Sequence, residues 1–395
     1  MIHSSWIEIN KTALRKNIRY LQKRLGNGVK FASVIKGNAY GHGIKEFVPL
    51  AEENGIDFFV VFDTNEALRA EAVKKPDTQL LIMGMINDEE LGWVIEKGIS
   101  FFVFDLDRLQ KAAMLARQQK TRARIHLELE TGLHRTGIEE AELDAALAIM
   151  RSNSRYLELE GVCTHLAGAE SITNYMRIQE QMRVFEKLTG ILKKRRFSPK
   201  YRHIACSAAA LIYPQSIMDM ARIGIAQYGY WPSMETKMNN LLSDENKFTR
   251  DPLQRILSWK SRVMSIKKVP AGSFVSYGNS FMTTKETKIA TIPIGYFHGY
   301  RRSLSNTGHV LIHGSKANVI GAVNMNVFQV NVSHIPGVQK GDEVVIIGTQ
   351  GKSSITVAGF SELSNQVNYE FLTRLPETIP RIVKENKQEI NGVQL

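Results

Sequence analysis

A lysine at the end of an apolar run is the residue with the clearest chemical potential in this chain. Lys36 directly follows five residues typical of a buried strand (31–35), and a turn-rich segment with three glycines (37–43) comes next. Burial lowers the pKa of a lysine, and imine formation with an aldehyde needs the uncharged amine. A lysine in this position is more often a solvated cap, so the interpretation depends on the rest of the chain.

Other reactive side chains follow later apolar runs in the same way. Arg135 and Ser207 each follow such a run, His165 ends one, and Arg222 opens one that also contains Gly224. Each residue has an ordinary structural interpretation, as a surface ion pair, a core histidine or a helix cap. Their repeated placement at strand ends favours one shared site, because the loops after the strands of a parallel barrel form its active site.

Eight apolar runs alternate with amphipathic stretches in the first two-thirds of the chain. We expect strands at residues 31–35, 58–62, 80–83, 101–104, 125–129, 159–165, 203–205 and 222–228. Helical patterns separate them, among others at residues 64–73, 106–118 and 175–194. Eight such units in series predict a closed (β/α)8 barrel of the TIM type over residues 1–245, with a doubly wound open sheet as the alternative.

The pattern changes after a polar, irregular segment (239–252) that is typical of a linker. Short alternating runs punctuated by glycine turns then predict a mainly-β domain over residues 246–395. Its expected strands are residues 261–266, 288–293, 309–312, 317–320, 329–332 and 343–347.

Composition narrows the class of protein further. The net charge is +12, but the basic residues are spread along the chain and the densest cluster (193–196) ends a predicted helix, so nucleic acid is not an expected partner. No apolar run approaches the roughly 20 residues needed to span a bilayer, and the N-terminus lacks a signal-peptide pattern, so we expect a cytoplasmic protein without a membrane partner. Two cysteines, Cys163 and Cys206, cannot build a disulfide framework or a structural zinc site, and no metal site is expected.

Residues 36–43 match the lysine motif K-x-x-A-Y-G-H-G of the fold-type III alanine racemases, which use pyridoxal 5′-phosphate (PLP). Residues 275–278, Val-Ser-Tyr-Gly, are similar to the tyrosine motif of that family. Further similar segments lie at residues 6–10, 293–296, 299–300, 304–306, 310–314, 341–345 and 380–381. The whole chain therefore resembles this family, in which the first strand (about residues 3–10) can pack with the C-terminal domain.

The resemblance implies an enzyme that interconverts L- and D-alanine, a reaction that serves D-alanine biosynthesis. Lys36 would hold PLP as an imine and act as the base on one face of the substrate. Tyr277 would serve the opposite face from the partner subunit, which implies a homodimer with shared active sites. The other implied contacts are Arg222 with the pyridine nitrogen, Tyr40, Ser207 and Gly224 with the phosphate, His165 in support of Arg222 and Tyr277, and Arg135 and Met325 with the substrate carboxylate.

These roles agree with the chemistry of racemisation. PLP delocalises the charge that is left when an α-proton is removed. Inversion then needs a proton acceptor on one face and a donor on the other, and both Lys and Tyr must be tuned to work near neutral pH. An arginine does not readily give up its proton, so a pyridine nitrogen that faces Arg222 stays unprotonated and side reactions are reduced.

Several positions depart from the family pattern. Glu128 stands where the family usually has a lysine, often carbamylated, and we expect its carboxylate to orient Arg135 directly. Glu377 stands where a tyrosine helps to hold the phosphate, so either Glu377 turns outward or the register shifts. Around the substrate entrance and the carboxylate site, uncharged or different residues replace the family's own at Ala322, Asn324, Asn326 and His298.

These departures leave alternatives to strict alanine specificity. One is a racemase of broader specificity that accepts serine or other small or basic amino acids. A PLP decarboxylase of the same fold type is disfavoured by Arg222 and Tyr277, and a non-catalytic PLP carrier would lack the β domain. A Cys163–His165 nucleophile would have no evident orienting partner.

Overall fold

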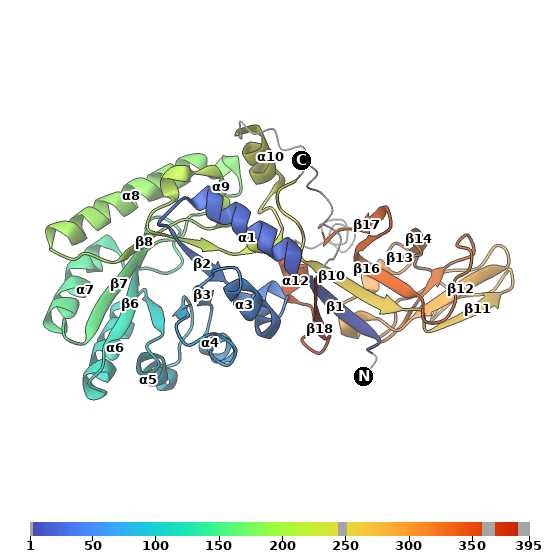
Figure 1. The fold of residues 1–395 in the computed structure, drawn as a ribbon, viewed down its shortest axis with the longest axis horizontal. Coiled ribbons are helices and arrows are strands. Elements are labelled where there is room, and N and C mark those ends of the chain that lie inside the picture. Colours follow the sequence, from blue (N-terminus) through green and yellow to red (C-terminus); the bar gives the residue numbers. More distant parts are fainter. Residues whose placement is uncertain (1–2, 244–250, 358–367, 386–395) are drawn as a thin grey trace, which may run out of the picture. The chain divides into compact units, whose positions relative to one another are not determined.

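The structure is a computed structural model that describes residues 3–243, 251–357 and 368–385. The chain folds as two compact units (Figure 1). One, the barrel unit, consists of residues 13–36 and 47–255. The other, the β unit, consists of residues 1–12, 37–46 and 256–395.

Parallel strands in the order β8-β7-β6-β5-β4-β3-β2-β9 form the sheet of the barrel unit. They are β2 (Lys30–Val34), β3 (Phe58–Val61), β4 (Gln79–Ile82), β5 (Ser100–Val103), β6 (Ala123–Glu128), β7 (Leu157–Cys163), β8 (Tyr201–His203) and β9 (Met220–Ile223). The predicted eight-stranded barrel is confirmed. The predicted last strand is too long, since β9 ends at Ile223 and a 3-10 turn, η3 (Ile225–Tyr228), follows it.

Strands β8 and β9 close the barrel through only a few bonds. The backbone N–H of Arg222 donates to the carbonyl oxygen of Ala205 at 3.0 Å, and that of Asp219 donates to Arg202 at 3.2 Å. A single parallel bridge joins Cys206 to Arg222. The barrel is therefore nearly closed, with a short seam between its first and last strands in space.

Helices connect the strands and, as Figure 1 shows for α5 to α8, lie outside them. The helices are α1 (Lys11–Leu25), α3 (Ile44–Glu52), α4 (Thr64–Glu71), α5 (Asp88–Glu96), α6 (Leu106–Gln118), α7 (Glu140–Ser152), α8 (Tyr175–Lys194), α9 (Ser207–Ile212) and α10 (Met234–Ser243), with 3-10 turns η1 (Ile172–Asn174) and η2 (Pro214–Ser216). Aspartates begin two of them: Asp63 accepts from the N–H of Glu66, and Asp105 from that of Arg108.

The predicted linker is helical at its start, because α10 continues to Ser243, while residues 244–250 lie outside the described residues. Within the described parts of the chain, no helix combines the length and the apolar character that a membrane crossing needs.

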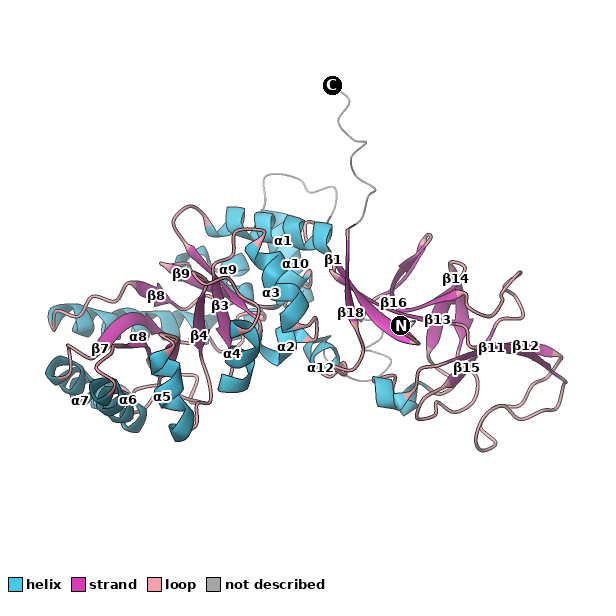
Figure 2. Ribbon diagram, turned by 60° about the horizontal axis from the view of Figure 1, so that its bottom comes forward, coloured by secondary structure: helices cyan, strands magenta, loops and turns pink. Residues whose placement is uncertain are grey.

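The β unit is mainly β, as Figure 2 shows by the predominance of strands. Its strands are β1 (Ser5–Asn10), β10 (Leu257–Arg262), β11 (Ser265–Val269), β12 (Thr287–Ile292), β13 (His309–Ile312), β14 (Ser315–Asn318), β15 (Phe328–Asn331), β16 (Glu343–Gln350), β17 (Ser353–Ile355) and β18 (Arg381–Lys384). One sheet has the order β14-β13-β16-β10-β1-β18, with β17 on β16, and a second has the order β11-β12-β15. Short helical pieces are η4 (Tyr296–His298), η5 (Arg302–Leu304) and α12 (Asn368–Thr373).

Strand β1 lies in this sheet, antiparallel to β10 and parallel to β18, with Ile7 opposite Trp259. Trp259 is fully buried, and its indole N–H donates to the hydroxyl of Ser5 at 2.7 Å. The N-terminal strand therefore supplies a hydrogen-bond acceptor to the core of the β unit.

The predicted strand at residues 261–266 is wrong, because the chain changes sheets inside it. Strand β10 ends at Arg262 and pairs with β16, whereas β11 begins at Ser265 and pairs with β12. Between them, the N–H of Val263 donates to Asp342 and that of Met264 to Thr291. The mixed polar and apolar pattern of residues 261–266 gives no sign of such a change of partner.

Candidate active site

Lys36 begins a turn with left-handed backbone, labelled α2 (Lys36–Tyr40). Gly37, Asn38, Ala39 and Tyr40 have φ angles of 62°, 53°, 54° and 51°. Such a conformation costs a non-glycine residue roughly 1–2 kcal/mol. Local bonds offset this cost, since Nδ1 of the buried His42 lies 2.9 Å from the carbonyl oxygen of Ala39 and the side chain of Asn38 accepts from the N–H of Ile44.

The end of this turn is held within the β unit by Arg381. The Arg381 guanidinium donates to the carbonyl oxygen of Gly41 at 2.9 Å, and also to those of Pro376 and Ile379 at 2.7 and 2.6 Å. Gly41 has a φ of 79°, and a Cβ atom there would lie 1.9 Å from the carbonyl oxygen of Leu372. The segment that follows the lysine is therefore fixed by contacts that only glycine permits.

Electrostatics favour a reactive amine at Lys36. Partial burial of the ammonium lowers the pKa of Lys36, and the positive charge of Arg135 lowers it further. Glu66 acts in the opposite direction, and Arg222 adds a smaller lowering effect. A lysine with a lowered pKa more readily supplies the uncharged amine that attacks a carbonyl.

Arg222 is a buried cation with neutral hydrogen-bond partners. Its Nη1 atom donates to the backbone oxygen of His203 at 2.8 Å and to Nδ1 of the same residue, and Nη2 donates to the backbone oxygen of Thr164 at 2.7 Å. Among the described residues, it forms no ion pair and no hydrogen bond with the side chain of His165. Burial and the nearby cations, Arg222 first, lower the pKa of His165 to about 3, so this imidazole is neutral.

His203 continues into a chain of buried side chains. Nε2 of His203 lies 2.7 Å from Nδ1 of His126, and Nε2 of His126 lies 3.2 Å from the carboxylate of Glu160. Ser100 also donates to Glu160. Because Arg222 can only donate, Nδ1 of His203 accepts, and each imidazole in turn donates through Nε2. The chain therefore runs in one direction, from guanidinium to carboxylate.

Ser207 and Gly224 come together as the resemblance requires. The Oγ atom of Ser207, 5% exposed, accepts from the N–H of Gly224 at 2.9 Å and from that of Ala226 at 3.5 Å. Ser207 is also the first residue of α9. Tyr40, the third predicted phosphate contact, belongs to the β unit and is half-buried.

Arg135 is exposed in the loop after β6, and Glu128 does not pair with it as expected. Instead, the Glu128 carboxylate accepts from the hydroxyl of Thr136 at 2.8 Å, and no ion pair joins Glu128 to Arg135 in the part of the chain that the structure describes. Burial raises the pKa of Glu128, although Thr136, Arg222 and Arg135 oppose that rise. Glu128 therefore reaches the loop through the residue next to the arginine.

Tyr277 and Met325 lie on two adjoining segments of the β unit. Their side chains are 75% and 54% exposed. Ser276 joins the segments by donating to the backbone oxygen of Ala322 at 2.9 Å and accepting from Nδ2 of Asn324 at 3.2 Å. The neutral Asn324 thus acts in positioning the tyrosine loop.

Two other positions bear on alternatives left open by the sequence. Glu377 is exposed between α12 and β18, which agrees with an outward orientation. Cys163 is fully buried, and burial raises the pKa of its thiol. A thiol held in its neutral form is a poor nucleophile, which disfavours the Cys163–His165 alternative.

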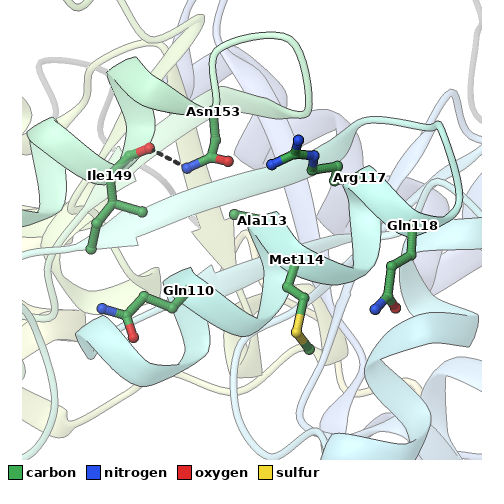
Figure 3. Close-up of a pocket in the computed structure, with 7 residues that line it drawn as sticks. All are labelled: Gln110, Ala113, Met114, Arg117, Gln118, Ile149 and Asn153. Carbon is green, nitrogen blue, oxygen red and sulfur yellow. Dashed lines mark hydrogen bonds between the residues drawn. The ribbon is translucent and has the colours of Figure 1, made fainter.

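Figure 3 shows a pocket of about 440 Å³ on the outer face of the barrel unit. It is lined by α6 and by the end of α7, where Nδ2 of Asn153 donates to the backbone oxygen of Ile149 at 2.9 Å. Of the residues that line it, Arg117 alone carries a charge, and none of the predicted site residues contributes. This pocket is therefore separate from the site predicted at the strand ends.

Comparison with known families decides the assignment. Residues 9–232 match the family described as "Alanine racemase, N-terminal domain", and residues 256–383 match "Alanine racemase, C-terminal domain". The chain belongs to the alanine racemase family. Membership of the alanine racemase family confirms the predicted fold class and makes the chain a PLP-dependent isomerase.

The similarity to individual relatives extends over nearly the whole chain. An alanine racemase of Leptospira interrogans serogroup Icterohaemorrhagiae serovar copenhageni is 35% identical over 383 residues, which is 96% of both chains. Alanine racemase 1 of Caldanaerobacter subterraneus subsp. tengcongensis is 34% identical over 379 residues, covering 95% of this chain and 94% of that one.

Solved structures give the same result. An alanine racemase from Bacillus anthracis with bound L-Ala-P has a TM-score of 0.87 at 30% identity, and covers 98% of this chain and 96% of its own. An alanine racemase from Bartonella henselae with covalently bound pyridoxal phosphate has a TM-score of 0.81 at 23% identity, with 97% and 100% covered, and shows likeness of fold.

The sequence alone did not identify the histidine chain. His126 and Glu160 occur within predicted strands, where a polar residue on an apolar strand is a weak signal. Glu160 and His203, the two partners of His126, lie 34 and 77 residues away from it in the sequence. Only the order of strands in the barrel brings the three side chains together.

Proposed function

We propose that this protein interconverts L- and D-alanine with PLP, using Lys36 and Tyr277 as the two proton-transferring residues. The observation that carries the proposal is the placement of Lys36, with its lowered pKa, near Arg135 and Arg222 at one end of the barrel strands. A cationic pair beside a reactive amine suits a substrate with a carboxylate and a cofactor with a basic ring nitrogen.

The residues of the barrel unit fit the cofactor in charge and hydrogen-bonding capacity. Arg222 is buried without an ion-pair partner among the described residues. Its Nη atoms donate to His203 and Thr164, and its Nε–H, which takes part in none of these bonds, is the donor that could face a ring nitrogen. Ser207 and the N–H of Gly224 form a polar pair at the start of α9, which suits a phosphate. When bound, the cofactor supplies an electron-withdrawing system that stabilises negative charge at Cα of the substrate.

Each side chain then has a defined task. Lys36 would hold the cofactor and would accept or donate the proton at Cα on one face. Arg135 binds the substrate carboxylate and orients Cα toward the amine. His165 is neutral and adds no positive charge beside Arg222. Its neutrality limits the electrostatic repulsion among Lys36, Arg135 and Arg222.

Tyr277 would supply the second proton from the partner subunit of a homodimer. Its side chain is 75% exposed, and other exposed apolar residues lie near it in sequence or on segments that hydrogen bonds connect to its loop. These neighbours in the β unit are Phe274, Met282, Tyr296, Phe297 and Met325, each at least 43% exposed. An exposed set of this kind is typical of a surface that another chain covers.

A chirality assay tests the activity directly. The purified protein with PLP is expected to convert L-alanine to the racemic mixture, and serine, lysine and arginine are offered in parallel to measure specificity. Lys36→Ala should abolish both turnover and the visible absorbance of bound PLP, whereas Tyr277→Phe should keep the absorbance and lose turnover. Release of CO₂ without inversion of alanine would replace this proposal with a decarboxylase.

Mixed dimers test the shared site. If Lys36 and Tyr277 of one site come from different subunits, co-expressed Lys36→Ala and Tyr277→Phe chains form hybrids with one intact site. Activity should then return although each variant alone is inactive. Failure of isolated hybrids to recover activity would show that both residues of a site belong to one chain.

We also propose a cytoplasmic location. Both cysteines, Cys163 and Cys206, are free, which suits a reducing compartment. Fractionation of the source cells, with an antibody against the protein, tests this location.

A further inference from the structure

Gln181 joins two loops that follow neighbouring strands of the barrel. Its side chain is 1% exposed on α8. The Oε1 atom accepts from the N–H of Ala167 at 2.8 Å, and Nε2 donates to the backbone oxygen of His165 at 3.0 Å and to the hydroxyl of Thr131 at 3.3 Å. One amide thus links the loop after β6 with the loop after β7.

The position of Gln181 in α8 is that of a core residue. It shares the buried face with Ile178, Met182 and Phe185, which follow the three- and four-residue spacing of a helix. A buried amide without partners would be costly, and here its hydrogen bonds go to the two loops and not to its own helix. The glutamine therefore gains its partners only when both loops are in place.

The contacts of Gln181 extend to the proposed cofactor residue. The hydroxyl of Thr131 lies 2.8 Å from that of Thr164, and the backbone oxygen of Thr164 accepts from Nη2 of Arg222 at 2.7 Å. Thr131 lies in the loop after β6 that carries Arg135. A continuous set of hydrogen bonds therefore connects the Arg135 loop, Gln181 and the carbonyl group that holds Arg222.

We propose that Gln181 is a positioning residue, which sets the Arg135 loop relative to Arg222 and so aligns the substrate carboxylate with the cofactor. This role rests on the proposed function, because it assigns the substrate carboxylate to Arg135. The loop has two further anchors: Glu130, which accepts from the N–H of His134 at 2.9 Å, and Arg177 of α8, which donates to the backbone oxygen of Gly132 at 2.7 Å.

Gln181→Met removes the three hydrogen bonds and keeps the length of the side chain. Gln179→Met on the same helix is the matched control, because Gln179 is half-buried and its amide nitrogen has no hydrogen-bond partner among the described residues. Thr131→Val is a second, milder variant that keeps the shape of a 5% exposed residue and removes only its hydroxyl.

The expected result is a change in substrate binding more than in turnover. In Gln181→Met, the KM for alanine should rise about tenfold in both directions while kcat changes less than about threefold. Thr131→Val should raise KM in the same direction by a smaller factor, and the bound-PLP absorbance should persist in both variants. Amide hydrogen exchange of residues 131–137 should become faster in both, and unchanged in Gln179→Met.

Two outcomes would overturn the proposal. One is an unchanged KM together with unchanged exchange of residues 131–137 in a folded Gln181→Met or Thr131→Val protein. The other is an equal rise of KM in the Gln179→Met control, which would indicate a general loosening of α8. If the wild-type protein fails to racemise alanine, the proposed function falls, whereas the exchange data still decide whether Gln181 holds the loop.

Discussion

Nε2 of His203 lies 2.7 Å from Nδ1 of His126, with both imidazoles fully buried inside the barrel. Their direction of hydrogen bonding is fixed at one end by Arg222, which donates, and at the other by Glu160, which accepts. Protonating either ring would place two donors face to face in a fully buried site. The pair therefore connects a buried cation to a buried anion while remaining neutral itself.

This neutrality makes the fold sensitive to acid. Burial lowers the pKa of His126 and of His203, whereas both titrate near their ordinary value of about 6.5 in the unfolded chain. Below that pH the unfolded chain binds more protons than the folded one, so the free energy of unfolding falls as pH decreases from about 6.5. Urea unfolding of the apoprotein across this range measures the slope.

His126→Asn should reduce that slope by about one proton, because one histidine that only the unfolded chain can protonate is gone. Equal slopes for the wild type and His126→Asn would contradict the neutral assignment.

Gly41 is predicted to be one of the least tolerant glycines. Gly41→Ala should lower the free energy of unfolding by about 3 kcal/mol, since its Cβ would lie 1.9 Å from the backbone oxygen of Leu372. Gly26→Ala is the matched control, with a similar φ of 85° and no atom within 4 Å of the added Cβ, and should cost only about 1 kcal/mol. Urea unfolding measures the loss of stability in both variants. Equal losses would show that the cost comes from the positive φ alone and not from the contact with Leu372.

Ser207 is predicted to contribute to cofactor affinity. Ser207→Ala leaves the N–H of Gly224 without its acceptor at 2.9 Å, and the dissociation constant for PLP should rise about tenfold. Ser216→Ala, which loses a bond of 2.7 Å to the backbone oxygen of Tyr213 in the next turn, controls for general loosening. Titration of the apoprotein with PLP provides both values. Equal affinities for the Ser207→Ala and wild-type proteins would remove Ser207 from the phosphate site.

Glu128 is predicted to act through its hydrogen bond to Thr136. Thr136→Val and Glu128→Leu should each raise the KM for alanine about tenfold, because the loop next to Arg135 loses its anchor. Glu128→Gln keeps an oxygen that can accept from Thr136, and its KM should stay within about threefold of the wild type. If Glu128→Gln is as impaired as Glu128→Leu, the negative charge and not the hydrogen bond is what matters.

The sequence predicts the barrel well because parallel strands buried on both faces are continuous apolar runs. Residues Phe58–Val61 of β3, all apolar and all buried, are an example. The family resemblance also assigns Ser207 and Gly224 to one phosphate site, and the structure brings these two residues within hydrogen-bonding distance. In contrast, the change of sheet after Arg262 leaves the hydrophobic pattern intact, and it depends on backbone partners from β12 and the residue before β16.

The site shows the same division. Lys36 follows the end of β2, where the alternation of strands and helices predicts it. Arg222 is predicted to open its strand, but it lies one residue before the end of β9. The partner of Glu128 is wrong in the sequence-based prediction, because Arg135 and Thr136 are adjacent in the loop and only the backbone path decides which one the carboxylate reaches. The sequence does not predict a role for Gln181, because a glutamine within an amphipathic helix gives no signal of its own.

The seam between β8 and β9 has a thermodynamic consequence. Its amides have the fewest ladder partners in the barrel, so they should exchange with deuterium before those of the central strands. Arg222 belongs to β9, and Ser207 lies four residues beyond β8. A small molecule that binds residues on both sides of this seam would stabilise the closed barrel. Its dissociation would then be coupled to local opening between β8 and β9.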